Sequence, residues 1–75
     1  MSQKGVKRME AGVRNQLTGR VVEIKESDLM SEVIIQVGDN QITSVMTTDS
    51  LKEAGFKMGD EATALIKAIN VVLTK

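Results

Sequence analysis

Neither cysteine nor histidine occurs in this 75-residue chain, and proline is absent as well. Without cysteine and histidine the chain can form no disulfide, no zinc finger, no thiol redox centre and no Cys- or His-based nucleophile–base pair. A domain this small buries only about 60% of the surface that its unfolded chain exposes, so a lone core is marginally stable. Oligomerisation is therefore the remaining means of stabilising it.

Aromatic residues are nearly absent too, since Phe56 is the only one. This argues against a surface that stacks the bases of RNA or single-stranded DNA. Ten basic residues balance ten acidic ones, so the whole chain has no net field that would attract nucleic acid or an anionic membrane. The balance is uneven, because residues 1–20 hold five basic residues against one acidic (+4) and residues 21–75 hold five against nine (−4).

The longest apolar runs are a few residues long, so no segment is predicted to span a membrane. The first eight residues are basic, but no apolar stretch follows them, which argues against a secretory signal. We therefore expect a cytoplasmic protein. Residues 1–11 are polar and show no sustained hydrophobic period, so they are predicted to be a flexible leader before a single domain over residues 12–75.

The sequence is rich in β-forming residues, with 21 valines, isoleucines and threonines in total. Hydrophobic patterning predicts five strands, over residues 17–26, 29–37, 41–47, 61–68 and 71–74. Gly19 indicates a bend or a close backbone approach in the first strand, and residues 38–40 form a hairpin connection. The order of these strands, with one short helix among them, predicts an all-β fold, a five-stranded OB-like (Greek-key) barrel.

The helix is predicted in TTDSLKEAG, residues 47–55, between the third and fourth strands. Leu51 and Ala54 have helical spacing, hydroxyls and Asp49 offer N-caps, and Gly55 is a natural stop. Residues 33–37 and 68–73 carry more apolar side chains than one small barrel interior can hold. We therefore expect part of them to lie in a subunit interface.

Recognised enzyme signatures are absent from the sequence, which contains no P-loop, no dinucleotide-binding glycine motif and no nucleophile elbow. The carboxylates lie chiefly in predicted turns and on exposed strand faces, where no pair is singled out for acid–base work. We predict that the protein is not an enzyme.

A few cationic and hydroxyl side chains have no evident structural use. Arg14 begins the first strand, Thr47, Thr48 and Ser50 lie on the first turn of the predicted helix, and Lys67 lies on an otherwise apolar strand face. Alone, each has a plain alternative, as a surface or interface arginine, as ordinary helix caps, or as a lysine extended along the barrel rim. Together they indicate a pocket of cations and donors, without nucleophile or base, that captures an anion.

Three strings, GVRNQLTG (12–19), ITSVMTTDSLKEAG (42–55) and IKAINVVL (66–73), resemble the molbindin or Mop domain of small molybdate-binding proteins. That domain is related to the C-terminal domains of molybdate-importer ATPases and of molybdate-responsive regulators. The resemblance runs from residue 11 to residue 75. It implies an OB-like barrel assembled as a hexamer, a trimer of dimers, that binds molybdate or tungstate between subunits. It implies no covalent cofactor, and a metal bound only as its oxyanion.

The resemblance also implies a set of oxyanion-binding residues, namely Gly12, Val13, Arg14, Thr47, Ser50, Lys67 and Ala68. Arg14 matches the arginine of the family's SARN motif and Lys67 the lysine of its IKA motif, while Val13 and Ala68 would contribute backbone N–H groups. Gly12 stands where many members have serine and Val13 where alanine is usual, so one side-chain hydroxyl is missing. Ile69 replaces a common threonine.

Molybdate and tungstate are tetrahedral dianions whose oxygens accept hydrogen bonds but carry no proton near neutral pH. A site made only of donors suits them and disfavours hydrogen phosphate, whose P–OH group needs an acceptor. We therefore predict intracellular storage and homeostasis of the oxyanion. The alternatives are a molybdate-sensing regulatory or interaction module without a storage role, a nucleic-acid-binding barrel, which the missing aromatics disfavour, and a step in cofactor synthesis.

Overall fold

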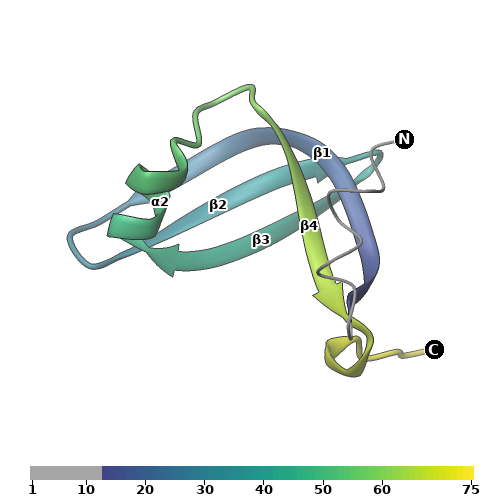
Figure 1. Ribbon diagram of the computed structural model, residues 1–75. Helices are drawn as coiled ribbons and strands as arrows, with labels where there is room; N and C mark the ends of the chain where they lie inside the picture. Colours follow the sequence, from purple (N-terminus) through teal and green to yellow (C-terminus); the bar gives the residue numbers. More distant parts are fainter. Residues whose placement is uncertain (1–12) are drawn as a thin grey trace.

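The computed structural model describes residues 13–75 (Figure 1). Gly12 and the predicted leader lie outside the described residues. Four antiparallel strands form one sheet in the order β3-β2-β1-β4. The elements are β1 (Val13–Glu26), β2 (Met30–Val37), β3 (Asn40–Thr47), α2 (Thr48–Ala54), β4 (Glu61–Lys67) and the short 3-10 helix η1 (Ala68–Asn70). The prediction of an all-β fold with a short helix between the third and fourth strands is confirmed.

Strand β1 is long because its two halves pair with different partners. Its first half, residues 13–20, pairs with β4, and residues 20–26 pair with β2. A register shift between Val21 and Glu23 marks a bulge, which increases the local twist of the strand. Gly19 permits close approach to β2, since a Cβ atom there would overlap the carbonyl oxygen of Gln36. The sheet consequently curls into a half-barrel (Figure 1).

Helix α2 covers one end of the half-barrel. It begins after Thr47, whose side-chain oxygen accepts a hydrogen bond from the backbone N–H of Ser50. It ends at Gly55, where φ is 73° and the backbone N–H donates to the carbonyl of Leu51, as expected for a glycine in the left-handed region. Leu51 packs with Val21, Val33 and Ile35 in the buried core. The predicted glycine stop is therefore confirmed.

The prediction of a fifth strand over residues 71–74 differs from the structure of the single chain. Strand β4 ends at Lys67, η1 follows, and residues 71–75 have no strand conformation. A strand needs the free edge of another strand to pair with, and the two free edges of this sheet are those of β3 and β4. Figure 1 shows the C-terminal segment leaving the end of β4 away from both edges. None of the helices within residues 13–75 is long and apolar enough to cross a membrane.

Candidate anion-binding site

The pairing of β1 with β4 brings together four of the predicted site residues. Val13 and Lys67 are partners across the two strands, and the register shift between Val13 and Asn15 makes Arg14 an extra residue beside them. Ala68 follows directly at the start of η1. The side chains of Arg14 and Lys67 are both exposed. We call Val13, Arg14, Lys67 and Ala68 the cationic half-site.

Within residues 13–75, no acidic side chain forms an ion pair with the cationic half-site. Residues 13–20 of β1 and residues 62–75 contain neither aspartate nor glutamate. Within residues 13–75 the ion pairs join Lys25 to Glu23 and Glu32, and Lys52 to Glu26, so neither cation of the half-site takes part. Two exposed cations without a carboxylate partner in the described residues leave their charge available to an anion.

Thr47 and Ser50 form a second group, the hydroxyl half-site, where β3 passes into α2. The Thr47 hydroxyl accepts from the Ser50 N–H at 3.1 Å and donates to the Ser50 hydroxyl at 2.8 Å. Thr47 is therefore the helix cap that the plain alternative describes. Its single hydroxyl proton is used, whereas Ser50 retains its own O–H, which points to Ser50 as the outward donor. Asp49 lies in the same turn and is exposed.

The two half-sites lie at opposite ends of the 14-residue strand β1. Val13, its first residue, pairs with Lys67. Glu26, its last residue, pairs with Ser31, which in turn pairs with Met46, the residue before Thr47. Figure 1 shows α2 and the β1–β4 end on opposite sides of the molecule. One chain thus brings Arg14 close to Lys67 but holds both far from Thr47 and Ser50.

Behind the hydroxyl half-site lie Ser31, which sequence reasoning did not place in the site, and Thr48, which it counted among the hydroxyls of the anion pocket. Thr48 is buried, so its hydroxyl does not face outward with that of Ser50. The hydroxyl oxygens of Ser31 and Thr48 are buried and 2.7 Å apart. The sequence offered a signal for the burial of Ser31, which alternates with the apolar Val33 and Ile35 along β2, but none for its contact with Thr48.

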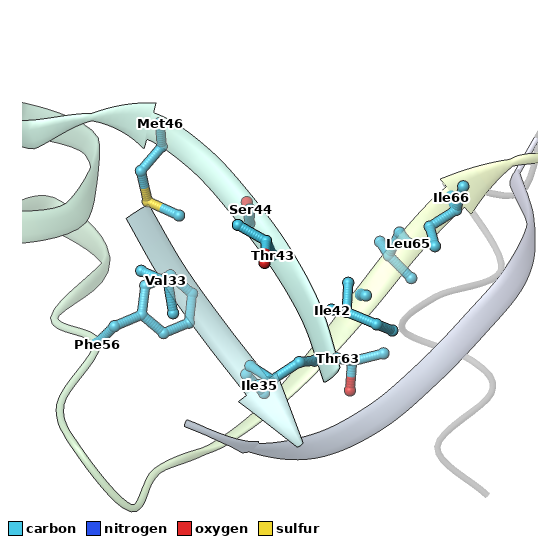
Figure 2. Close-up of a pocket in the computed structure, with 12 residues that line it drawn as sticks. Val33, Ile35, Ile42, Thr43, Ser44, Met46, Phe56, Thr63, Leu65 and Ile66 are labelled. Carbon is cyan, nitrogen blue, oxygen red and sulfur yellow. The ribbon is translucent and has the colours of Figure 1, made fainter. Parts of the chain in front are cut away.

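An apolar groove of about 300 Å³ lies between the edge strands β3 and β4 (Figure 2). Ile42 and Met46 line it from β3, Leu65 and Ile66 from β4, and Phe56 from the loop after α2. Strands β3 and β4 do not pair across this groove, so the half-barrel is open here. None of the residues that line the groove within the described part of the chain is a cation. Residues 13–75 contain no cluster of acidic side chains that could hold a metal ion directly.

Comparison with known proteins identifies the fold. Residues 12–73 match the TOBE domain. Molybdenum-pterin-binding protein 1 of Clostridium pasteurianum is 42% identical over 66 residues, which are 87% of this chain and 97% of that protein. A molybdate-binding protein from Sporomusa ovata has a similar structure, with a TM-score of 0.81 and 28% identity over 89% of this chain and 100% of its own.

A second solved structure, the cytoplasmic molybdate-binding protein ModG with molybdate bound, gives a TM-score of 0.78. It is 35% identical, and the match covers 89% of this chain and 48% of that one. The curled sheet and the short helix α2, as described over residues 13–75, thus have the fold of a TOBE domain. The chain belongs to the TOBE domain family and, within it, to the Mop molybdenum-pterin-binding proteins. The resemblance to the Mop domain is confirmed, and all three relatives are named as binding proteins.

Proposed function

We propose that this chain binds molybdate between the subunits of a homo-oligomer, and that tungstate can occupy the same site. The observation that carries the proposal is the placement of the two half-sites at opposite ends of β1. If the cations and the hydroxyl donors act on one anion, they must come from different copies of the chain. Two copies are the fewest that can complete such a site.

The chemistry of the two half-sites suits an anion without protons. Arg14 offers a planar fork of N–H donors, Lys67 a compact charge with three donors, and Ser50 a free O–H. Val13 and Ala68, together with Gly12, which precedes Val13 in sequence, would add the backbone N–H groups that the family pattern implies. Hydrogen phosphate needs an acceptor for its own proton, so this donor set favours molybdate, tungstate and sulfate over it.

A bare oxyanion fits this chain better than a molybdenum–pterin compound, although the relatives' names include pterin. A pterin ring is flat and is held best by stacking on an aromatic side chain. Phe56 is the only aromatic residue, and it packs against the hydrophobic core. The half-sites therefore have no stacking surface, and ModG, solved with molybdate bound, supports the simpler ligand.

Assembly is supported by apolar surface that a single chain leaves unpaired. Ile69, Val72 and Leu73 are each 88% exposed, and the groove between β3 and β4 is open. A fifth strand that closes the barrel has to pair in this gap, and residues 71–74 have the composition of a strand. We propose that residues 71–74 of another subunit complete a five-stranded OB-like barrel with Greek-key order, within a hexamer built as a trimer of dimers.

We propose cytoplasmic storage and homeostasis of the oxyanion as the role of this binding. The donor set includes no group that could convert the anion, which supports a binding protein over an enzyme, and ModG is described as cytoplasmic. The scarcity of aromatic residues and the zero net charge do not favour nucleic acid as a partner. Residues 12–75 would form the single binding domain.

The test combines native mass measurement with calorimetric titration of the full chain at fixed ionic strength. The proposal predicts a hexamer of about 49 kDa, six times the chain mass of 8.2 kDa, that binds molybdate and tungstate more tightly than sulfate and shows no saturable binding of phosphate. A monomer that binds none of these anions would contradict both the assembly and the ligand. Equal affinity for sulfate would reduce the site to a general anion site.

A further inference from the structure

The buried hydroxyls of Ser31 and Thr48 form a directed chain of hydrogen bonds. The Thr48 hydroxyl donates to the backbone carbonyl of Ser27 at 2.7 Å, because a carbonyl oxygen can only accept. Its one proton is therefore used, so the 2.7 Å contact between the two hydroxyls has Ser31 as donor and Thr48 as acceptor. The sequence of donation runs from Ser31 to Thr48 to the Ser27 carbonyl.

These hydrogen bonds connect the start of α2 to the turn between β1 and β2. The backbone N–H of Thr48 also donates to the carbonyl of Leu29 at 2.8 Å. Thr48 is thus held through its backbone and its side chain, and it is only 4% exposed. Since Thr48 follows Thr47 and begins the helical turn that carries Ser50, its position constrains the orientation of both exposed hydroxyls.

Packing alone does not require hydroxyls at these two places. Replacing both partners of a buried hydrogen bond by apolar groups of similar shape is often nearly neutral for stability, whereas a hydrogen-bonded pair imposes a direction. Ser31 and Thr48 are buried beneath the first turn of α2, and the hydroxyl half-site is exposed on the outer side of that turn. The site that we propose needs such a fixed direction, because the Ser50 donor must meet an oxygen of an anion held by another subunit.

We propose that Ser31 and Thr48 are positioning residues for the oxyanion site, which hold the Thr47–Ser50 hydroxyls in the orientation that the anion requires. The inference rests on the proposed function of Ser50 as an anion donor. Ser31 and Thr48 do not touch the anion themselves. They act through the hydroxyl half-site.

The test is a double-mutant cycle in the full chain, with molybdate affinity measured by calorimetry. Ser31→Ala removes the donor to Thr48 and should weaken molybdate binding about three- to tenfold. Thr48→Val should do the same, and Thr48→Ser, which keeps the hydroxyl, should restore affinity to within about twofold. In a Ser50→Ala background, Ser31→Ala should have almost no further effect, because the residue through which it acts is gone.

Ile24→Val is the matched control, since it truncates a half-buried side chain packed on the core and leaves the hydroxyl chain intact. It should lower the unfolding midpoint without changing affinity. Equal losses of affinity in Ser31→Ala and Ile24→Val, or additive losses of Ser31→Ala and Ser50→Ala, would overturn the positioning role. If Arg14→Ala weakens binding but Ser31→Ala does not, only this inference fails. A wild-type chain that binds no molybdate would overturn the proposed function and this inference with it.

Discussion

Removal of the Arg14 side chain is the perturbation whose effect the structure predicts most sharply. Arg14 is exposed and forms no ion pair within residues 13–75, so Arg14→Ala should change the stability of the folded chain little. Hydrogen bonds to charged groups contribute about 1.5–3 kcal/mol, and about 1.4 kcal/mol is one decade in affinity. Arg14→Ala should therefore weaken molybdate binding about 10- to 100-fold.

The matched control is Arg20→Ala, which removes the same charge from the same strand. Arg20 is exposed and donates to the carbonyl of Gly59 at 3.0 Å, away from the cationic half-site in the register of β1 with β4. At about 0.15 M salt the Debye length is about 8 Å, so a charge removed at a distance should change affinity by less than about twofold. Arg14→Lys should recover part of the loss, because a point charge cannot reproduce the guanidinium fork.

The assay is calorimetric titration with molybdate at fixed ionic strength, with sulfate as the competing anion and native mass to confirm that each variant is assembled. Lys67→Ala should match Arg14→Ala, and Ser50→Ala should cost less, because water or a neighbouring N–H can replace one hydroxyl. Unchanged affinity in Arg14→Ala would refute the assignment of the cationic half-site. An equal loss in Arg20→Ala would mean that binding depends on overall charge and not on a defined site.

Three further changes test other parts of the account. Gly19→Ala should destabilise the fold by about 1–3 kcal/mol in urea unfolding, because its Cβ overlaps the Gln36 carbonyl; a neutral effect would contradict the close approach of β1 and β2. Asp49→Asn should strengthen molybdate binding about twofold, because it removes a like charge beside Ser50, and weaker binding would show that the carboxylate supports the site. Deletion of residues 71–75 should dissociate the hexamer into smaller species, as measured by native mass. An intact hexamer would exclude this segment from the interface.

Local sequence signals predicted the elements whose structure depends on nearby residues. The β2–β3 hairpin turns at Gly38, where φ is 59°, and α2 ends at Gly55, as the glycines indicated. The expectation for β1 began at residue 17, whereas the strand begins at Val13. Residues 13–16 are largely polar, and their strand conformation depends on pairing with β4, some 50 residues away in sequence. Local patterning carries no information about such a partner.

The pairing of the fifth strand and the geometry of the site could not be predicted from the sequence for the same reason. Residues 71–74 have high β-propensity, but propensity supplies no partner, and the single chain offers them none. The resemblance named the site residues, yet spacing in sequence could not show that Arg14 and Lys67 become neighbours while Thr47 and Ser50 lie at the far end of β1. The Ser31–Thr48 contact likewise follows from the register of β2 and β3, which a single sequence does not reveal.

The central claim is that one anion is held by half-sites from different subunits, and complementation in mixed oligomers tests it most directly. Arg14→Ala chains lack the guanidinium of the cationic half-site, and Ser50→Ala chains lack the donor of the hydroxyl half-site. When the two variants are unfolded, mixed and refolded together, some sites should combine the intact cationic half-site of one chain with the intact hydroxyl half-site of the other. Calorimetry should then detect a fraction of sites with wild-type affinity for molybdate, which neither variant shows alone. Mixed oligomers confirmed by native mass that contain no such sites would contradict the claim, because they would show that the two half-sites do not meet across a subunit interface.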